Sequence, residues 1–380
     1  MKILNKVTPE KIGVNVAFKN MKNDHTLEIK DIVNVNENYP YVTRILLSLF
    51  NEGRLSNIED IKVEKNYGYI TQIKYKDGNY RITYGSDVGI NSGSSEELAK
   101  DKGYTKFILK DIGINVPKGE EFLLPWWVDT IRESQAKRGN NNIKTSDKAV
   151  DYVYKELGFP VYVKSVNGSK GLDVYKVQDE NELNEIFSIY NEKKVKVAII
   201  EEVIAMPDYR IVILDGELIS AYKRIPLTVI GNGESNIKQL LENLQIQYDK
   251  EGRDTRLDSN DIRIIKFLKD KGLELEYIPS LNEKLTLMAV SNLSAGGTSK
   301  DVTDSIDKKW ISLSSYIAKN FNLRLCGIDI SCEDITSPDS EYSILEINSS
   351  PGLDHYASSG EKQRKIVEEL YIKVFNAIKH

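Results

Sequence analysis

Two residue types that form cross-links and metal sites are scarce in this sequence. It contains two cysteines, Cys326 and Cys332, and three histidines, His25, His355 and His380. The cysteines lie in or beside a predicted strand, roughly 20 Å apart when extended, which is too far for a disulfide within one strand. No cluster of cysteine and histidine is present to bind zinc. The sequence therefore argues against both a disulfide and a zinc site.

Long apolar runs and an excess of positive charge are also missing. No segment has the length and apolarity of a membrane helix, and residues 1–20 lack the apolar core of a signal peptide. The 52 basic and 57 acidic residues give a net charge of -5, without the basic footprint of a nucleic-acid-binding protein. We therefore expect a cytoplasmic protein that binds neither membranes nor nucleic acids.

The composition is that of a globular protein with several domains. Hydrophobic residues make up 40% and charged residues 29% of the 380 residues, which are enough for two or three domains. We divide the chain into an N-terminal accessory domain (1–93), a middle part (94–205) and a C-terminal part (206–380). Apolar residues alternate on both sides of Asp77-Gly78 and again of Asp215-Gly216, and both pairs favour tight hairpin turns.

Helical and strand patterns alternate along the rest of the chain. One helix is expected from Ser94, with a capping box at Glu97, to Gly113. Residues 236–273 should be mostly helical, and a C-terminal helix should begin near Glu361. The other expected elements are helices at 146–157 and 180–191, a long helix before residue 325, and strands at 160–164, 172–177, 196–204, 285–292, 325–332 and 342–347.

Acidic and amide side chains follow one another late in the sequence. Glu346 and Asn348 share one face of a predicted strand, because residues two apart do so. If the strand with Asp329 lies beside it, two carboxylates and an amide oxygen converge. Such a ligand set suits magnesium held together with nucleotide phosphates. The alternative is a pair of solvated acids on an edge strand.

A lysine at the end of a predicted buried strand is followed by a glycine-bearing loop. Lys164 can direct its ammonium group at phosphates while residues 167–171 cover them with backbone N–H groups. The spacing is not that of a P-loop. The alternative is a plain hairpin turn with a solvated lysine.

Two further segments contain residue types that bind nucleotides or anions. The strand that ends at Glu201–Ile204 can pair its backbone with an adenine edge, and Asp208 can accept hydrogen bonds from ribose hydroxyls. The alternative is a core strand that leads into a polar loop. Arg210 and Arg224, on the arms of a predicted hairpin, either make bidentate contacts with phosphate or carboxylate or form a surface ion pair.

The order of these segments resembles that of the ATP-grasp superfamily of carboxylate–amine ligases. Phe159–Lys164 resembles the family's lysine strand, Glu201–Asp208 its hinge, and Leu345–Gly352 its last metal-binding strand. A narrower resemblance, to the ATP-grasp part of cyanophycin synthetases and bifunctional glutathione synthetases, rests on Asp208–Leu214, Arg224–Leu240 and Asn292–Asp304. The resemblance extends over about residues 95 to 378.

The resemblance implies an α+β ATP-grasp fold, in which two α+β subdomains grip ATP. The first 90 residues show no clear match to these families, and we expect them to form a small N-terminal α/β domain that helps to set the substrate. The resemblance implies a ligase that activates a carboxylate as an acyl phosphate and joins it to an amine. The implied cofactors are ATP and Mg2+, with two ions and with Mn2+ as a substitute. The implied substrates are amino acids or short peptides, and the implied assembly is a homodimer or homotetramer. A phosphotransferase or thiol ligase on the same fold stays an alternative, as does a non-catalytic nucleotide-binding regulator.

The resemblance also implies roles for individual residues. ATP contacts are expected at Lys102, with its neighbour Lys106, and at Lys164, Gly168, Ser169, Gly171, Glu201, Glu202, Val203 and Asp208. Metal ligands are expected at Asp329, Glu346 and Asn348. Contacts with the γ-phosphate and the acyl phosphate are expected at Arg210, Arg224, Asn292, Gly296 and Gly297.

One position departs from the pattern of a related family. Gly327 stands where D-alanine–D-alanine ligases carry an arginine, so the positive charge near the reacting phosphoryl group must come from Arg210 or Arg224. Residues 167–171 and 294–300 are candidate lids that keep water from the acyl phosphate. His355 is either a contact of the acceptor substrate or a plain loop residue.

Overall fold

The computed structural model describes residues 26–28, 36–136, 144–166, 168, 173–251, 253 and 255–377, with side chains except at 26–28 and 132–136. The chain forms two compact units. One unit joins Met1–Ser92 to Gly352–His380, and the other is Gly93–Pro351. The division into three parts, with boundaries at residues 93 and 205, stays a prediction. The structure shows in addition that the C-terminal segment Gly352–His380 belongs to the first unit.

The first unit contains an antiparallel sheet of four strands in the order β1-β2-β3-β4. The strands are β1 (Thr26–Glu28), β2 (Ile58–Glu64), β3 (Ile70–Tyr75) and β4 (Tyr80–Tyr84). The hairpin predicted about Asp77-Gly78 is confirmed as β3 and β4. Gly78 has a φ of +88°, a conformation that glycine adopts without a steric penalty.

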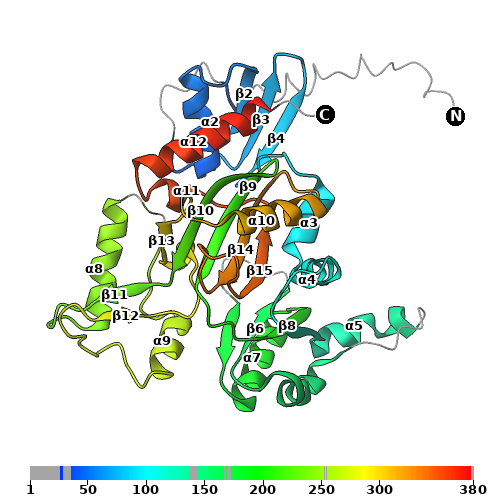
Figure 1. Ribbon diagram of the computed structural model, residues 1–380, viewed down its shortest axis with the longest axis vertical. Helices are drawn as coiled ribbons and strands as arrows, with labels where there is room; N and C mark the ends of the chain where they lie inside the picture. The colour runs from blue at the N-terminus through cyan, green and yellow to red at the C-terminus, as the bar shows by residue number, and fades with distance from the viewer. Residues whose placement is uncertain are drawn as a thin grey trace. The chain divides into compact units, whose positions relative to one another are not determined.

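The helices of this unit come from both of its chain segments. They are α2 (Tyr41–Asn51), α11 (Asp354–Ala357) and α12 (Glu361–Asn376), and α12 begins where the C-terminal helix was predicted. Figure 1 shows α12, in red, alongside α2, in blue. Leu46 and Leu49 of α2 and Leu370 and Phe375 of α12 are at most 1% exposed. The core that α2 begins is therefore completed by residues more than 300 positions later in the chain.

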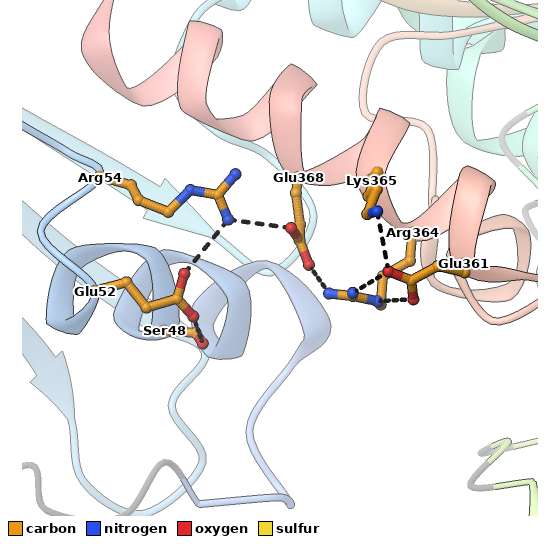
Figure 2. A network of polar contacts seen from close by, with 7 residues as sticks. All are labelled: Ser48, Glu52, Arg54, Glu361, Arg364, Lys365 and Glu368. Carbon is orange, nitrogen blue, oxygen red and sulfur yellow. Dashed lines mark hydrogen bonds and ion pairs between the residues drawn. The ribbon is translucent and has the colours of Figure 1, made fainter.

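An exposed ionic network joins the end of α2 to α12. Figure 2 shows the carboxylate of Glu368 between the guanidinium groups of Arg54 and Arg364. Arg54 Nη1 lies 3.1 Å from Glu368 Oε2 and 3.3 Å from Glu52 Oε2. The other members of the network are Ser48, Glu361 and Lys365. Such solvated pairs contribute little to stability, so the buried apolar contacts hold this unit together.

The second unit contains an antiparallel sheet in the order β5-β8-β6-β7. Its strands are β5 (Gly119–Leu123), β6 (Val161–Ser165), β7 (Val174–Val177) and β8 (Val197–Glu202), and the neighbouring helices are α5 (Pro125–Ala136), η2 (Ser146–Lys148), α6 (Ala149–Tyr152), η3 (Val153–Leu157) and α7 (Glu180–Glu192). Val161 and Val163 pack with Leu183 and Tyr190 in one core, so Lys164, which alternates with them, faces away from it. The elements predicted between 146 and 204 are confirmed to within a few residues.

The helix predicted from Ser94 to Gly113 is instead two helices, α3 (Gly93–Lys100) and α4 (Lys102–Asp111). Asp101 separates them, and its carboxylate accepts a hydrogen bond from the Tyr104 N–H at 3.0 Å. An aspartate in this position is a favourable N-cap, so it starts a new helix. The new helix leaves Tyr104 67% exposed and turns Lys102 and Lys106 inward, to 8% and 9% exposure.

A second antiparallel sheet has the order β13-β10-β9-β14-β15. Its strands are β9 (Asp208–Leu214), β10 (Glu217–Ile225), β13 (Thr298–Asp301), β14 (Leu325–Cys332) and β15 (Tyr342–Asn348). One face packs on α10 (Lys308–Asn320), α3 and α4, where Ile211, Ile328 and Trp310 are fully buried. Figure 1 shows α10, in orange, across this sheet. Polar side chains occupy the opposite face, which carries the candidate site.

A smaller core surrounds the two-stranded sheet of β11 (Thr228–Ile230) and β12 (Lys284–Thr286). The helices α8 (Ile237–Lys250) and α9 (Ile262–Lys269) cover it, and η4 (Leu293–Ala295) follows. The helical prediction for 236–273 holds for α8 and α9 but not for the segment between them. The strand predicted at 285–292 is wrong beyond Thr286, where the pairing of β12 with β11 ends.

The observed elements confirm the predicted α+β class, with several antiparallel sheets and packed helices. Cys326 and Cys332 are buried free thiols on β14, as expected from their spacing. In the described part of the chain, no helix combines the length and apolarity needed to cross a bilayer.

Candidate active site

The polar face of the five-stranded sheet carries one row of side chains across four strands. In the strand register, Arg210 of β9 lies opposite Tyr222 of β10 on one side and opposite Asp329 of β14 on the other. Asp329 in turn lies opposite Glu346 of β15. The condition on which the predicted metal site depended, that the strands of Asp329 and Glu346 are neighbours, is therefore met.

Asp329 lies at the centre of this row, between two arginines. Its carboxylate accepts hydrogen bonds from Arg210, with Nε–Oδ1 and Nη2–Oδ2 distances of 2.6 and 2.8 Å. Arg224 Nη1 lies 3.0 Å from Asp329 Oδ2. Burial opposes the ionisation of Asp329, which is 2% exposed, but the two guanidinium groups outweigh burial and hold the pKa of the carboxyl below its usual value.

The three predicted metal ligands lie together on β14 and β15. Asn348 Nδ2 is 3.5 Å from Asp329 Oδ2, and Glu346 is the register partner of Asp329. Among the described residues, no group of three or more acidic, histidine or cysteine side chains could hold a metal by itself. Two carboxylates and an amide oxygen nevertheless fit Mg2+, which is commonly bound by one or two carboxylates and completes its shell with phosphate or water oxygens.

Gly327 leaves the space that Arg210 occupies. A Cβ atom at this position would lie 3.3 Å from Arg210 Cδ and 3.0 Å from Pro351 Cβ. The side chain of Arg210, from the neighbouring strand β9, thus passes directly over Gly327 of β14. The guanidinium groups of Arg210 and Arg224 both contact Asp329, one of the predicted metal ligands. Their catalytic roles stay predictions.

Arg224 contacts Asp329 and also two residues that were predicted near the γ-phosphate and the ribose, Asn292 and Asp208. Its Nη1 donates to Asn292 Oδ1 at 3.4 Å, and its Nη2 lies 3.9 Å from Asp208 Oδ2. Ser291 Oγ also donates to Asp208 Oδ2, at 2.5 Å. Asp208 and Asn292 are thus brought together with the metal-binding candidates, as the sequence led us to expect.

The loop Asn292–Gly297 is fixed from the side of α8. Tyr248 OH donates to the Gly296 carbonyl at 2.8 Å. Arg253 Nη2 donates to the carbonyls of Leu293 and Gly297, at 3.2 and 3.0 Å. These bonds orient a loop whose first residue touches Arg224.

Both glycines of this loop are required by its backbone. Gly296 has a φ of +95°, in the left-handed region, and a Cβ atom at Gly297 would lie 2.7 Å from the Ile225 carbonyl oxygen. The lid predicted at 294–300 is wrong for residues 298–300, because they belong to β13 and pair with β10.

A second buried carboxylate, that of Glu201 at the end of β8, lies between two lysines. Glu201 Oε2 is 2.5 Å from Lys164 Nζ, and Oε1 pairs with Lys106. Burial lowers the pKa of Lys164 to about 8, although Glu346 acts in the opposite direction. Burial, together with the Lys164 ammonium group, also lowers the pKa of Lys106. Two ammonium groups share one carboxylate, so the cluster has an excess positive charge that suits phosphates.

The other predicted nucleotide contacts are only partly brought to this cluster. Lys102 donates to the Gly168 carbonyl, so Lys106 rather than Lys102 takes the place beside Lys164. Glu202 is held elsewhere, because its Oε1 accepts the Lys118 N–H at 2.7 Å. Val203 directly follows β8. The predicted contacts Ser169 and Gly171 lie outside the described residues.

Four residues near these clusters were not predicted, namely Tyr222, Tyr248, Arg253 and Ser291. Tyr222 and Ser291 had a signal in the sequence, because Tyr222 shares a strand face with Arg224 and Ser291 precedes Asn292. Tyr248 and Arg253 had none, because their contacts with the loop join residues 40 or more positions apart in the chain. His355, whose role was left open, lies on α11 in the first unit, 3.8 Å from Asp354.

Known proteins are similar to this chain in sequence and in fold. A family model of the RimK-like ATP-grasp domain matches residues 134–257. Cyanophycin synthetase from Geminocystis herdmanii is 30% identical over 289 residues, which are 73% of this chain and 30% of that protein. The glutathione biosynthesis bifunctional protein GshAB from Clostridium perfringens is 30% identical over 285 residues, which are 73% of this chain and 34% of that protein. The crystal structure of a bifunctional glutathione synthetase from Pasteurella multocida matches with a TM-score of 0.54 and 20% identity, over 88% of this chain and 44% of that one.

The fold is thus an ATP-grasp fold, whose members bind ATP, generally with Mg2+. More narrowly, the chain contains a RimK-like ATP-grasp domain and is homologous to the ATP-grasp regions of cyanophycin synthetases and GshAB proteins. It spans about a third of the length of these relatives. The predicted family and fold are confirmed, and the roles of individual residues stay predictions.

Proposed function

We propose that this protein is an ATP-dependent ligase that forms an amide bond between a carboxylate and an amine, with amino acids or short peptides as substrates. The main support is the pair of buried clusters on an ATP-grasp scaffold. The lysines around Glu201 offer positive charge to phosphates, and the row around Asp329 offers both arginines and oxygen ligands. The names of two relatives, a cyanophycin synthetase and a glutathione biosynthesis bifunctional protein, agree with this chemistry.

The first step transfers a phosphoryl group. An oxygen of the substrate carboxylate attacks the γ-phosphorus of ATP, and the bond from that phosphorus to the β–γ bridging oxygen breaks. The products are an acyl phosphate and ADP. Lys106 and Lys164 hold phosphates, while Arg210 and Arg224 neutralise negative charge on the group in transit. When bound by Asp329, Glu346 and Asn348, Mg2+ supplies Lewis-acid stabilisation.

The second step forms the amide. The amine nitrogen attacks the acyl carbon, the bond from this carbon to the phosphate oxygen breaks, and the nitrogen loses a proton to the departing phosphate. The chain needs no covalent nucleophile for either step. The loop Asn292–Gly297 lies next to Arg224, where it can exclude water from the acyl phosphate.

We further infer two Mg2+ ions, which Mn2+ can replace, and a homodimer or homotetramer. The facing carboxylates of Asp329 and Glu346 support two ions, because each can ligate one of them. A titration with Mn2+ in the presence of ATP, followed by electron paramagnetic resonance, should saturate at two ions per chain, and saturation at one would contradict this. Light scattering on the eluting protein tests the assembly, and a monomer mass would contradict it.

The decisive experiment measures ADP release from Mg-ATP with pooled amino acids and dipeptides, and the product mass by mass spectrometry. A ligase requires both an acid and an amine, and its product weighs as much as the two substrates minus water. ADP release that needs no amine would instead indicate a phosphotransferase. ATP binding without turnover on any pool would indicate a regulator and overturn the proposal.

A further inference from the structure

Arg253, which follows α8, joins the two ends of the loop Asn292–Gly297. Its Nη2 atom donates hydrogen bonds to the carbonyls of Leu293 and Gly297, at 3.2 and 3.0 Å. Hydrogen bonds from a charged donor are stronger than those between neutral groups. For the loop to move away from this position, both bonds must break together.

Tyr248 adds a third hydrogen bond to the same loop and supports Arg253. Tyr248 is 3% exposed, and its hydroxyl donates to the Gly296 carbonyl at 2.8 Å. Burial raises the pKa of this hydroxyl, although Arg253 acts in the opposite direction, so the hydroxyl keeps the proton that it donates. The guanidinium carbon of Arg253 lies 3.8 Å from the centre of the Tyr248 ring, a cation–π contact that orients the two side chains together.

The loop also contacts β10, at Arg224 and at the residue after it. Asn292 Oδ1 accepts a hydrogen bond from Arg224 Nη1 at 3.4 Å. A Cβ atom at Gly297 would lie 2.7 Å from the Ile225 carbonyl oxygen, so this end of the loop is tightly packed. The loop is thus held next to the guanidinium group that the proposed mechanism places at the transferring phosphoryl group.

We infer that Tyr248 and Arg253 are positioning residues that hold this loop against β10 and so keep water from the acyl phosphate. The inference rests on the proposed ligase function. In the reaction to be prevented, a water oxygen attacks the acyl carbon and the bond from this carbon to the phosphate oxygen breaks, which yields the original carboxylate, phosphate and a proton. One ATP is then consumed without an amide. The two residues therefore determine how closely ATP consumption is coupled to amide formation.

The test measures ADP and amide in the same reaction, because ADP in excess of amide reports hydrolysis. Arg253→Ala should raise the ratio of hydrolysis to amide formation about tenfold, the effect of losing a hydrogen bond to a charged group. Tyr248→Phe removes only a neutral donor and should raise this ratio about fivefold. Total ADP release should stay within about threefold of the wild type, because the charged groups that act on the phosphoryl group remain.

Arg256→Ala is the matched control, because Arg256 is exposed and pairs with Asp249. Its ratio of hydrolysis to amide formation should equal that of the wild type. Guanidinium ion, added to Arg253→Ala far below denaturing concentrations, should lower the ratio by taking the place of the missing group. In a variant that is only destabilised, this denaturant would reduce activity further. A ratio in Arg253→Ala that stays at the wild-type value, or that guanidinium does not lower, would overturn the inference.

Hydrogen exchange of the loop amides needs no turnover and separates this inference from the proposed function. The N–H groups of Ala295 and Gly297 both donate to the Asn292 carbonyl, so they exchange when the loop opens. Their exchange should be about tenfold faster in Arg253→Ala than in Arg256→Ala. Equal exchange in both variants would overturn the inference even if the wild type forms an amide. A wild type that forms no amide from any pool would overturn the proposed function, and faster exchange would still support the restraint of the loop by Arg253.

Discussion

On each of two sheets of the Gly93–Pro351 unit, a buried carboxylate lies between two cations, and the two sheets differ in the cations. Glu201 lies between Lys106 and Lys164 on one sheet, and Asp329 lies between two arginines on the other. Both carboxylates are 2% exposed. Arginine keeps its charge in proteins and forms bidentate contacts, whereas burial readily changes the charge of lysine. The arginine cluster is therefore fixed in charge, and the lysine cluster responds to pH.

In both clusters, the two cations are already paired with one carboxylate. Under the proposed function, ATP phosphates would compete with Glu201 for the lysines, and a metal ion would compete with Arg210 and Arg224 for Asp329. Removing one partner of such a buried ion pair lowers the free energy of unfolding, because the other charge is left buried and uncompensated. The comparison thus predicts large effects in the arginine cluster, a pH effect in the lysine cluster, and almost none where a similar arrangement is exposed.

The largest effect is expected for Asp329→Asn, which leaves two buried guanidinium groups without their carboxylate. The free energy of unfolding in urea should fall by about 3–5 kcal/mol. ADP release should fall about 10³-fold, since charge stabilisation in the site is also lost. Asp334→Asn is the control, because Asp334 is exposed on the segment after β14. Wild-type stability of Asp329→Asn would show that the arginine cluster does not depend on its acid.

Arg224→Ala should reduce kcat for ADP release by about 10²–10³, because it removes a charge aimed at the transferring phosphoryl group. Lys223→Ala, the neighbouring change on the opposite face of β10, should leave kcat within about twofold. An unchanged kcat in Arg224→Ala would remove this residue from the mechanism and leave Arg210 as the source of the charge.

The affinity for ATP should depend on pH, because Lys164 in the lysine cluster can lose its proton. The pKa of Lys164, lowered to about 8 by burial, lies below that of an ordinary lysine, so the ammonium group loses its proton as the pH rises through 8. Between pH 7 and pH 9 the affinity for Mg-ATP, measured by calorimetry, should therefore fall about tenfold. Lys164→Arg stays charged and should bind with a flatter profile. A native profile as flat as that of the variant would contradict the assignment.

The smallest effect is expected where an acid lies between two cations at the surface. Glu368 contacts Arg54 and Arg364 in the network of Figure 2, but water solvates these groups. Arg54→Ala should not move the urea midpoint beyond the error of the measurement. A shift comparable to that of Asp329→Asn would mean that burial does not explain the difference between the clusters.

Local patterns in the sequence were sufficient for much of the fold. The strand at 325–332 was predicted with the observed bounds of β14, because apolar residues at 326, 328, 330 and 332 alternate with Gly327, Asp329 and Ser331. The break between α3 and α4 was missed, because the cap formed by Asp101 competes with a helical stripe that continues past it. Leu287 and Met288 fit a strand by composition, but β12 loses its partner strand after Thr286, which no local pattern shows.

The composition of the site was easier to predict than its contacts. Asp329 and Glu346 were correctly expected to lie together if their strands were neighbours. Two arginines contact Asp329 because of the register between β9, β10 and β14. No local sequence pattern specifies that register. That Lys106 meets Glu201 depends on the rotation of α4, which Asp101 determines.

The first unit has a consequence for how this protein is synthesised. The ribosome releases Leu46 and Leu49 early, but their unit also needs α12, which follows the whole of Gly93–Pro351. At about 5–20 residues per second, these roughly 260 residues take about 13 to 52 seconds to translate. During that time α2 exposes an apolar stripe that chaperones can bind, while the ATP-grasp unit can already fold. The part of this chain that is translated first is thus the last that can complete its fold.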